Sequence, residues 1–371
     1  MFSFVTHFFR TWNFFEKTIV FNISHLLGSK YASARGCVVL GLKKFSRVLV
    51  TGGAGFIGSH LVDRLMRMDC FVRVVDNLSA GGLGNVRAWV DSERFEFVRG
   101  DLKDLGVAER AVDGVEVVFH LAANPEVRVA MVDPSVHFRE NLLTTFNVLE
   151  AVRKSETAGL VVFFSSSTVY GEPAVFPTCE DYGPVLPISV YGASKLGCEA
   201  LISAYCHTFG VRGLVFRLAN VVGGRSGHGV IVDFVRKLRE NPKVLEILGD
   251  GSQSKSYLHV KDCVDAVLHA LRHFFDEKKA LEVYNVGSLD KVDVKRIAEI
   301  VSEEMGLHDL EFKFTGGVDG GRGWRGDVKT MLLSVDRLLS LGWRPRFNSE
   351  EAVRLSCREL LRSIGSARVS V

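Results

Sequence analysis

The chain has 371 residues, of which 47% are apolar, and a net charge of +3 from 46 basic and 43 acidic side chains. Since domains hold about 100–200 residues, this length predicts a large core and two lobes. Charges of both signs are spread along the whole chain, so no basic surface for nucleic acid is indicated. The seven cysteines are scattered and lack C-x-x-C spacing, which argues against a disulfide framework and a metal site and favours a reducing cytoplasm.

Residues 1–46 differ from the rest of the chain because they are rich in phenylalanine. Arg10, Glu16 and Lys17 interrupt this segment before an apolar run reaches the ~18 residues of a membrane span, and no cleavage site follows an apolar core. No membrane span is therefore predicted. Two interpretations stay open: the segment precedes the true start of the protein, or it associates with a surface. In both cases we expect it to be dispensable for catalysis.

The first clear motif begins with the apolar run at 48–50 and continues into glycines at 52, 55 and 58, after which a helical period starts. This G-x-x-G-x-x-G spacing predicts a strand, a tight turn and a helix. The glycines allow the backbone to approach a pyrophosphate closely at the helix N-terminus. The sequence therefore predicts a dinucleotide site. Its predicted contacts in this stretch are Gly52, Gly55, Phe56, Ile57 and Gly58.

A second strand is predicted at 71–75, and it ends at Asp76. An acidic side chain at this position accepts hydrogen bonds from both hydroxyls of the adenosine ribose and repels the 2′-phosphate of NADP. No arginine follows directly at Asn77 or Leu78. The predicted cofactor is therefore NAD.

Further short apolar strands are predicted at 95–99, 115–121 and 161–164, and helical periodicity runs from 136 to 152. Strands that alternate with helices in this way predict an α/β fold with a Rossmann-type, doubly wound parallel sheet. Ligands of such sheets collect at the carboxyl ends of the strands. The other predicted cofactor contacts fall at these ends or on the helix that follows, and they are Asn77, Asp101, Leu102, Leu121, Ala122, Ala123 and Asn141.

A candidate catalytic pair lies at the start of a predicted helix, where Tyr191 precedes Lys195 by four residues. This spacing places both side chains on one helix face, so that an ammonium group can lower the pKa of the phenol. Ser166 lies at the end of the strand at 161–164, where its hydroxyl can orient a substrate oxygen that Tyr191 deprotonates. The three residues together indicate an oxidoreduction site.

A sixth strand at 214–217 leads to Asn220, after which glycine and charge increase. We place the lobe boundary here, with an NAD-binding domain at 47–222 and a smaller α/β substrate lobe at 223–371 that is partly interleaved with it. Basic residues on two loops of this lobe suit an anionic substrate such as a nucleotide diphosphate. They are Lys255, Arg322 and Arg325.

These motifs resemble the extended short-chain dehydrogenase/reductase family, and most closely its NAD-dependent UDP-glucose (UDP-galactose) 4-epimerases of the archaeal type. The resemblance runs from about residue 47 to residue 345. It implies Ser166, Tyr191 and Lys195 as the catalytic residues and Asn220 as a contact to the substrate nucleotide. The segments that carry it are 51–60, 76–79, 100–101, 120–123, 165–171, 191–195, 257–262 and 284–287.

The chain departs from its relatives at three places. Sugar-nucleotide dehydratases carry an Asp-Glu pair where this chain has Ser167 and Thr168, so dehydration lacks its acid and base. Two arginines that hold the diphosphate in other epimerases are replaced by Lys255 and by Trp324, which Arg322 and Arg325 flank. Met331 occupies the position whose side chain, in family members, determines how much space the sugar has.

The resemblance implies a UDP-hexose 4-epimerase, in which Tyr191 takes the proton of the sugar 4-hydroxyl while hydride passes from C4 to NAD and returns to the opposite face. Lys195 would bind the nicotinamide ribose and lower the Tyr191 pKa. Two alternatives stay open: a related enzyme that acts on UDP-glucuronate or a UDP-N-acetylhexosamine, and a non-catalytic NAD-binding protein. The resemblance also implies a homodimer formed through the helix at 141–152 and the helix that begins at Tyr191, which carries Leu196, Ala200 and Ala204 at helical spacing.

Overall fold

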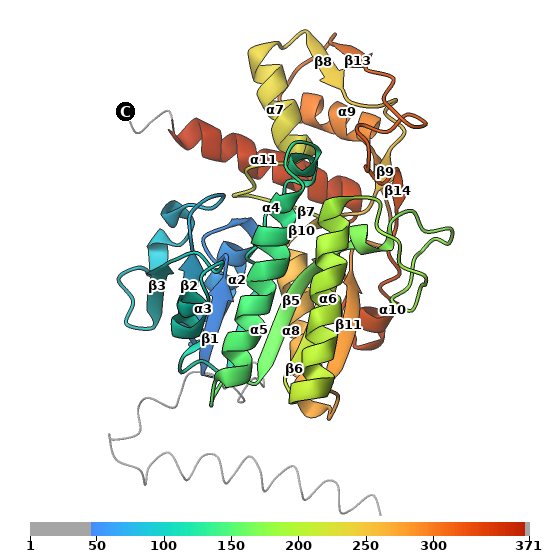
Figure 1. The fold of residues 1–371 in the computed structure, drawn as a ribbon. Helices are drawn as coiled ribbons and strands as arrows, with labels where there is room; N and C mark the ends of the chain where they lie inside the picture. The colour runs from blue at the N-terminus through green and yellow to red at the C-terminus, as the bar shows by residue number, and fades with distance from the viewer. Residues whose placement is uncertain (1–45, 368–371) are drawn as a thin grey trace, which may run out of the picture. The chain divides into compact units, whose positions relative to one another are not determined.

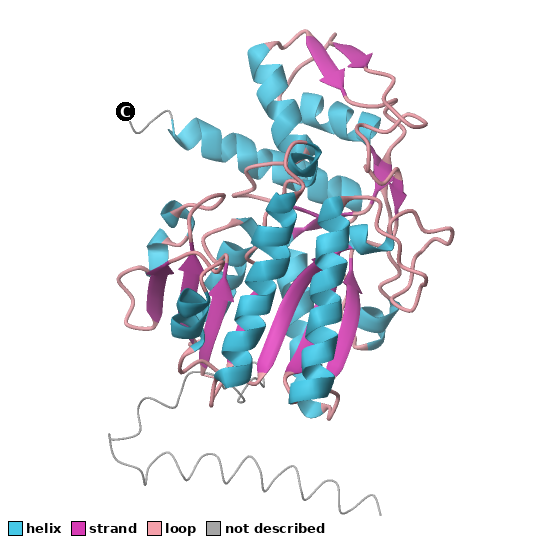
Figure 2. Ribbon diagram, viewed as in Figure 1, coloured by secondary structure: helices cyan, strands magenta, loops and turns pink. Residues whose placement is uncertain are grey.

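The computed structural model of the protein describes residues 46–367, and a seven-stranded parallel sheet forms its centre (Figure 2). The strand order is β11-β6-β5-β4-β1-β2-β3. It confirms the predicted Rossmann-type sheet, because β1 lies in the middle and the order reverses there. The strands are β1 (Arg47–Thr51), β2 (Phe71–Asp76), β3 (Phe95–Arg99), β4 (Val117–His120), β5 (Leu160–Ser166), β6 (Arg212–Leu218) and β11 (Leu281–Val286).

Helices cover both faces of this sheet, which explains why its inner strands are apolar along their whole length. On one face, α3 (Leu105–Val112), α5 (Thr144–Lys154) and α6 (Val190–Phe209) pack on a core that includes Leu49, Val118, Val161 and Val215. The other face carries α2 (Phe56–Met66) and α8 (Val260–Asp276), which contact each other (Figure 1). All ligand-facing loops therefore gather at the carboxyl edge of the strands.

The helix predicted at 136–152 is not a regular α-helix. It consists of α4 (Ser135–His137), the π-helical turn η6 (Phe138–Leu143) and α5. At the end of this turn the carbonyl oxygen of Asn141 accepts the backbone N–H of Thr144 and also the hydroxyls of Thr144 at 3.0 Å and Thr145 at 2.7 Å. π-Helical turns frequently occur at functional sites, and this one holds a predicted cofactor contact.

The second lobe has its own core between α7 (Val230–Glu240), α9 (Val294–Glu304) and α11 (Ser349–Ala367). The segment after residue 222 is interleaved with the first lobe, because β11 pairs with β6 in the large sheet. The remaining elements are η3 (Leu83–Asn85), η4 (Arg87–Trp89), η5 (Val127–Met131), η7 (Ser167–Tyr170), β7 (Asn220–Val222), β8 (Val244–Ile247), β9 (Ser254–Lys255), β10 (Tyr257–His259), β12 (Val292–Asp293), β13 (Glu311–Phe314), β14 (Thr330–Met331) and α10 (Asp336–Ser340).

Within residues 46–367, no helix is long and apolar enough to cross a membrane. The predictions made for residues 1–46 lie outside the described residues, apart from Ser46.

Candidate functional site

The glycine-rich turn between β1 and α2 is shaped by close backbone contacts. Gly52 has a φ of +66°, and a Cβ at this position would lie 2.9 Å from the backbone nitrogen of Ala122. A Cβ on Gly58 would lie 2.3 Å from the carbonyl oxygen of Gly52. Only glycine is accommodated at these two positions, so the turn is as tight as the pyrophosphate cradle of a dinucleotide site requires.

The first turn of α2 points into this cradle. Gly55 is the N-cap residue and offers no side chain to the free N–H groups, and Phe56 and Ile57 follow as the first helical residues. Uncapped N–H groups at a helix N-terminus bind anions. The predicted contacts in this stretch are therefore grouped as a pyrophosphate site requires, and the turn fits NAD.

Asp76 lies at the end of β2, next to the same turn. Its carboxylate accepts hydrogen bonds from the N–H groups of Ala54 at 3.0 Å and Leu78 at 2.8 Å, and it is 8% exposed. These two bonds fix the orientation of the carboxylate at the end of β2, and its contact with the ribose stays a prediction. Asp76 thus has a second role that the sequence did not indicate, because it ties the glycine-rich turn to β2.

Replacement of Asp76 by alanine is expected to weaken NAD retention and to relax the discrimination against NADP, because the ribose acceptor and its charge are both lost. Removal of hydrogen bonds to a charged group costs about 1.5–3 kcal/mol each. Dissociation constants for NAD and NADP, measured by calorimetry on the wild type and the variant, check this prediction. Unchanged affinity for both cofactors would contradict the assignment.

The neighbouring predicted contacts are Asn77, Asp101 and Leu102. The amide of Asn77 donates to the carboxylate of Asp101 at 3.3 Å, so these two side chains lie together beyond β2 and β3. Leu102 is buried in the core, and its carbonyl oxygen accepts from the amide of Asn147 at 2.8 Å. For Leu102, cofactor contact stays a prediction.

The chain after β4 is held against the glycine-rich turn. The hydroxyl of Thr51 accepts hydrogen bonds from the N–H groups of Leu121 at 3.1 Å and Ala122 at 3.0 Å. The backbone of Leu121 and Ala122 is the part of this loop that comes closest to Gly52, so the contact requires glycine at position 52. For Ala122 and Ala123, cofactor contact stays a prediction.

Asn141 connects this loop to the catalytic helix. Its side-chain oxygen accepts from the N–H of Asn124 at 2.8 Å, and its amide donates to the hydroxyl of Ser194 at 2.9 Å. Ser194 lies between Tyr191 and Lys195 on α6. Asn141 is thus fully engaged within the protein.

The three predicted catalytic residues converge at the carboxyl end of β5. Ser166 ends this strand, and Tyr191 and Lys195 lie on the first and second turns of α6. The ammonium group of Lys195 donates to the carbonyl oxygen of Phe164 at 2.9 Å and lies 4.8 Å from the ring centroid of Phe163. Lys195 is therefore buried against the strand that carries Ser166.

Burial affects the ionisation of both Tyr191 and Lys195. Burial raises the pKa of Tyr191 to about 12, and the Ser166 hydroxyl acts in the opposite direction. Burial also lowers the pKa of Lys195 to about 8. Burial of the phenol therefore acts against the lowering of the Tyr191 pKa that was expected from Lys195, and that lowering stays a prediction.

His137 is a site residue that sequence analysis missed. Its ring packs edge-on against the ring of Tyr191 with centroids 5.4 Å apart, and its Nδ1 lies 3.3 Å from the amide of Asn141. A single histidine in an apolar helix carries no signal of its own. Only the packing of α4 on α6 reveals the contact.

The remaining predicted substrate contacts lie on β7, on β9 and in the loop that precedes β14. Asn220 begins β7, which pairs with β10. The ammonium group of Lys255 forms an ion pair with the buried carboxylate of Asp327 at 2.6 Å and lies 5.9 Å from the ring of Trp324. Lys255 is thus oriented by Asp327.

The two arginines that flank Trp324 differ in their surroundings. Arg322 pairs with Glu172, which follows η7 in the first lobe, whereas Arg325 is exposed. A third arginine, Arg128, places its guanidinium carbon 5.6 Å from the Trp324 ring. Arg128 belongs to η5, and no sequence motif singles it out.

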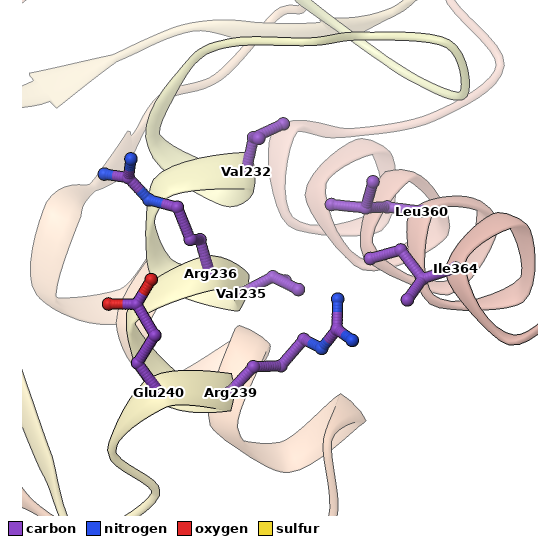
Figure 3. Close-up of a pocket in the computed structure, with 7 residues that line it drawn as sticks. All are labelled: Val232, Val235, Arg236, Arg239, Glu240, Leu360 and Ile364. Atoms are coloured by element: carbon purple, nitrogen blue, oxygen red, sulfur yellow. The ribbon is translucent and has the colours of Figure 1, made fainter. Parts of the chain in front are cut away.

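A separate hollow lies between α7 and α11 in the second lobe (Figure 3). It has a volume of about 360 Å³ and is lined by Val232, Val235, Arg236, Arg239, Glu240, Leu360 and Ile364. The valines face Leu360 and Ile364 across it (Figure 3). None of the predicted site residues lines this hollow.

Comparison with known proteins agrees with this geometry. Residues 48–287 match the NAD dependent epimerase/dehydratase family. The chain belongs to this family. Its members are NAD-dependent, in agreement with the glycine-rich turn and Asp76.

Individual relatives are similar over most of their length. A Methanocaldococcus jannaschii protein provisionally named UDP-glucose 4-epimerase is 34% identical over 312 residues, which are 83% of this chain and 96% of the relative. A crystal structure of a UDP-galactose 4-epimerase is 47% identical, with a TM-score of 0.77 over 86% of this chain and 99% of that one. The Thermotoga maritima UDP-glucose 4-epimerase, solved with UDP-glucose, is 31% identical, with a TM-score of 0.75 and the same coverage.

Proposed function

We propose that this protein is an NAD-dependent isomerase that interconverts UDP-glucose and UDP-galactose by oxidation and re-reduction of the sugar C4. The observation that carries the proposal is the convergence of Ser166, Tyr191 and Lys195 at the end of β5, beside a turn built for NAD. The names of the relatives support the substrate class.

Each catalytic residue has one task in this reaction. Tyr191 accepts the proton of the 4-hydroxyl and later returns it, and Ser166 orients the same oxygen. Lys195 places a positive charge near the phenolate and binds the nicotinamide ribose. Bound NAD supplies the redox chemistry by accepting hydride from C4 and giving it back. Inversion requires the 4-keto sugar to turn in the pocket, so the nucleotide is held firmly and the sugar loosely.

The purified protein, incubated with UDP-galactose, is expected to produce UDP-glucose without net consumption of NAD. Chromatographic separation of the two sugar nucleotides measures the product, and the absorbance of NADH reports transient reduction of the cofactor. Failure to convert either UDP-hexose while NAD is bound would rule the proposal out. Complete absence of NADH formation with any UDP-sugar would favour a non-catalytic NAD-binding protein.

Four cations are candidates for the diphosphate: Lys255, Arg322, Arg325 and Arg128. We infer that Arg128 contributes, because its guanidinium reaches Trp324 and half of its side chain stays exposed. Arginine binds phosphate through two parallel hydrogen bonds, which lysine does not form.

The variant Arg128→Gln is therefore expected to bind UDP about 10-fold more weakly, since a charge-assisted hydrogen bond contributes about 1.5–3 kcal/mol. Binding of uridine, which has no phosphate, should not change. Lys313→Gln on β13 is the matched control, because it removes another exposed positive charge. Equal losses of UDP and uridine affinity would show that Arg128 acts on the fold and not on the diphosphate.

A second candidate substrate class follows from Met331. This side chain is buried in β14, which pairs with the strand of Lys255. Because methionine is flexible, it adapts to sugars of different size. Turnover of UDP-N-acetylglucosamine or UDP-glucuronate at a rate equal to that of UDP-glucose would favour this alternative.

We also infer that the protein is a homodimer that pairs through α5 and α6, which lie side by side (Figure 1). Phe138 on η6 and Phe146 on α5 are 59% and 41% exposed, and Ala200 and Ala204 on α6 are exposed as well. Leu196, by contrast, packs against a core cluster, so it does not belong to the proposed surface. Exposed apolar side chains over two adjacent helices are typical of subunit contacts.

Light scattering at micromolar concentration is expected to give twice the mass of one chain. Phe146→Glu should yield a monomer, because it places a charge in the proposed contact. Phe314→Glu on β13 is the control, since Phe314 is equally exposed at 40% and lies on another element. A monomeric wild type would remove the proposal.

We infer a cytoplasmic location. Five cysteines among the described residues, Cys179, Cys198, Cys206, Cys263 and Cys357, form no disulfide bond, which a reducing compartment favours.

A further inference from the structure

A buried ion pair lies directly behind the catalytic residues. Glu199 on α6 follows Lys195 by one helix turn, and its carboxylate meets the guanidinium of Arg217 from β6. The shortest contact, between Nη2 and Oε2, is 2.8 Å, and Nε lies 3.1 and 3.2 Å from the two carboxylate oxygens. Only 7% of Glu199 and 8% of Arg217 are exposed.

The carboxylate has a second partner on the strand that carries the catalytic serine. The hydroxyl of Ser165 donates a hydrogen bond to Oε1 of Glu199, and Ser165 directly precedes Ser166 in β5. Glu199 therefore joins the end of β5 to the helix of Tyr191 and Lys195. No other described side chain hydrogen-bonds the Ser165 hydroxyl.

Arg217 extends the network to the loop that follows the serine. Its Nη1 donates to the hydroxyl of Tyr170 at 3.0 Å and to the carbonyl oxygen of Glu180 at 3.1 Å. The Tyr170 hydroxyl in turn donates to Asn285 on β11 at 2.8 Å. The ends of three neighbouring strands, β5, β6 and β11, are thus connected through one buried ion pair.

Stability alone does not explain this arrangement. Burial of two charges is costly, and replacement of a buried ion pair by apolar residues of similar volume is often neutral or stabilising by about 1–4 kcal/mol. Arg217 is moreover the one buried charged residue of β6, and it lies between Phe216 and Leu218. Its location next to the reaction centre points to a role in the reaction.

We propose that Glu199, held in place by Arg217, is a positioning residue that sets the distance between Ser166 and the Tyr191–Lys195 helix and places a negative charge beside the Lys195 ammonium. The proposal rests on the proposed function, in which these three residues act on the sugar 4-hydroxyl. It predicts effects on turnover and not on substrate binding, because Glu199 contacts neither substrate nor cofactor.

The charge acts on a group whose proton is weakened by burial. Burial lowers the pKa of Lys195, and Cys198 and then the carboxylate of Glu199, both on the same helix, act in the opposite direction. The other titratable groups near Lys195 are His120 from β4, His137 from α4 and Tyr191 itself. Removal of the Glu199 charge leaves Lys195 with a lower pKa, so the ammonium loses its proton at a lower pH.

The test uses Glu199→Gln and the double variant Glu199→Gln/Arg217→Met. The single variant leaves Arg217 buried without its counter-charge and is expected to melt at a lower temperature. The double variant removes both charges and keeps the volume, so its melting temperature should return towards the wild-type value. Glu109→Gln, which removes an exposed ion pair with Lys154, is the control for a simple change of charge.

In the double variant, kcat is expected to stay at least 10-fold below that of the wild type, with KM changed less than 2-fold, since small misplacement of catalytic groups costs up to about 10²-fold. The limb of the kcat profile that reports the Lys195 proton should move to lower pH. Ser165→Ala should reduce kcat without moving this limb, because it loosens the strand but keeps the charge.

Recovery of the wild-type kcat and pH profile in the double variant would overturn the proposal. It would show that the ion pair serves only the packing of α6 on β6. A double variant that does not fold would overturn it as well. NAD affinity as a function of pH is measured in parallel, because Lys195 binds the cofactor and this readout needs no sugar turnover. A wild type that binds NAD but converts no UDP-hexose contradicts the proposed function, whereas an unshifted pH dependence of NAD affinity contradicts the role of Glu199.

Discussion

Tyr191→Phe is expected to lower kcat for the interconversion of UDP-glucose and UDP-galactose by about 10²–10⁴-fold, the usual contribution of a general acid–base group. The substitution removes only the oxygen that moves the proton. The phenylalanine ring keeps the contact with the His137 ring, since the centroids of the two rings at these positions lie 5.4 Å apart. The fold and the cofactor site should therefore be unaffected. The dissociation constants for NAD and UDP should therefore stay near their wild-type values.

The pH dependence provides a second readout for this variant. Burial raises the pKa of Tyr191, so in the wild type the rate is expected to rise with pH as the phenol loses its proton. Phenylalanine has no proton to lose, and this rise should disappear. Near-normal turnover by a Tyr191→Phe protein that retains NAD would show that another group transfers the proton.

Gly58→Ala is expected to abolish NAD retention. The new Cβ would lie 2.3 Å from the carbonyl oxygen of Gly52 and 2.9 Å from the Cα of Gly53, and both are backbone atoms that move only with the whole turn. Overpacking of this kind costs about 1–3 kcal/mol, and here the strain falls on the pyrophosphate cradle. Bound NAD per chain, quantified after denaturation, and the thermal midpoint measure the two consequences.

Gly84→Ala is the matched control for this experiment. A Cβ at Gly84, in η3, would meet no atom within 4 Å. The same chemical change is therefore expected to leave bound NAD and the thermal midpoint unchanged. If Gly58→Ala retained NAD as well as Gly84→Ala does, the close approach of α2 to the turn would not be required for cofactor binding.

The local elements of the nucleotide-binding lobe follow from the sequence alone. Each strand of the large sheet is a short apolar run, because both faces of the sheet are covered. The glycines at 52, 55 and 58 are explained by backbone contacts that side chains would block. The spacing of Tyr191 and Lys195 is a property of one helix turn, so it too was readable without a structure.

Interactions between distant segments were not readable in this way. The sequence did not show that His137 packs on Tyr191, that Arg128 reaches Trp324, or that Asp76 binds the backbone of Ala54. Each of these contacts joins residues from different elements, and no periodicity encodes which elements meet.

The ionisation of the catalytic residues was decided by the tertiary structure as well. From the helix spacing, a positive charge beside Tyr191 was expected to lower its pKa, whereas burial of the phenol raises it to about 12. The sequence by itself determined which groups share a helix face. Only the packing of α6 against β5 and β6 determined how much water those groups lose and which buried charges, among them Glu199 and Arg217, surround them. Desolvation depends on all neighbours in space, so it cannot be deduced from residues that are close along the chain.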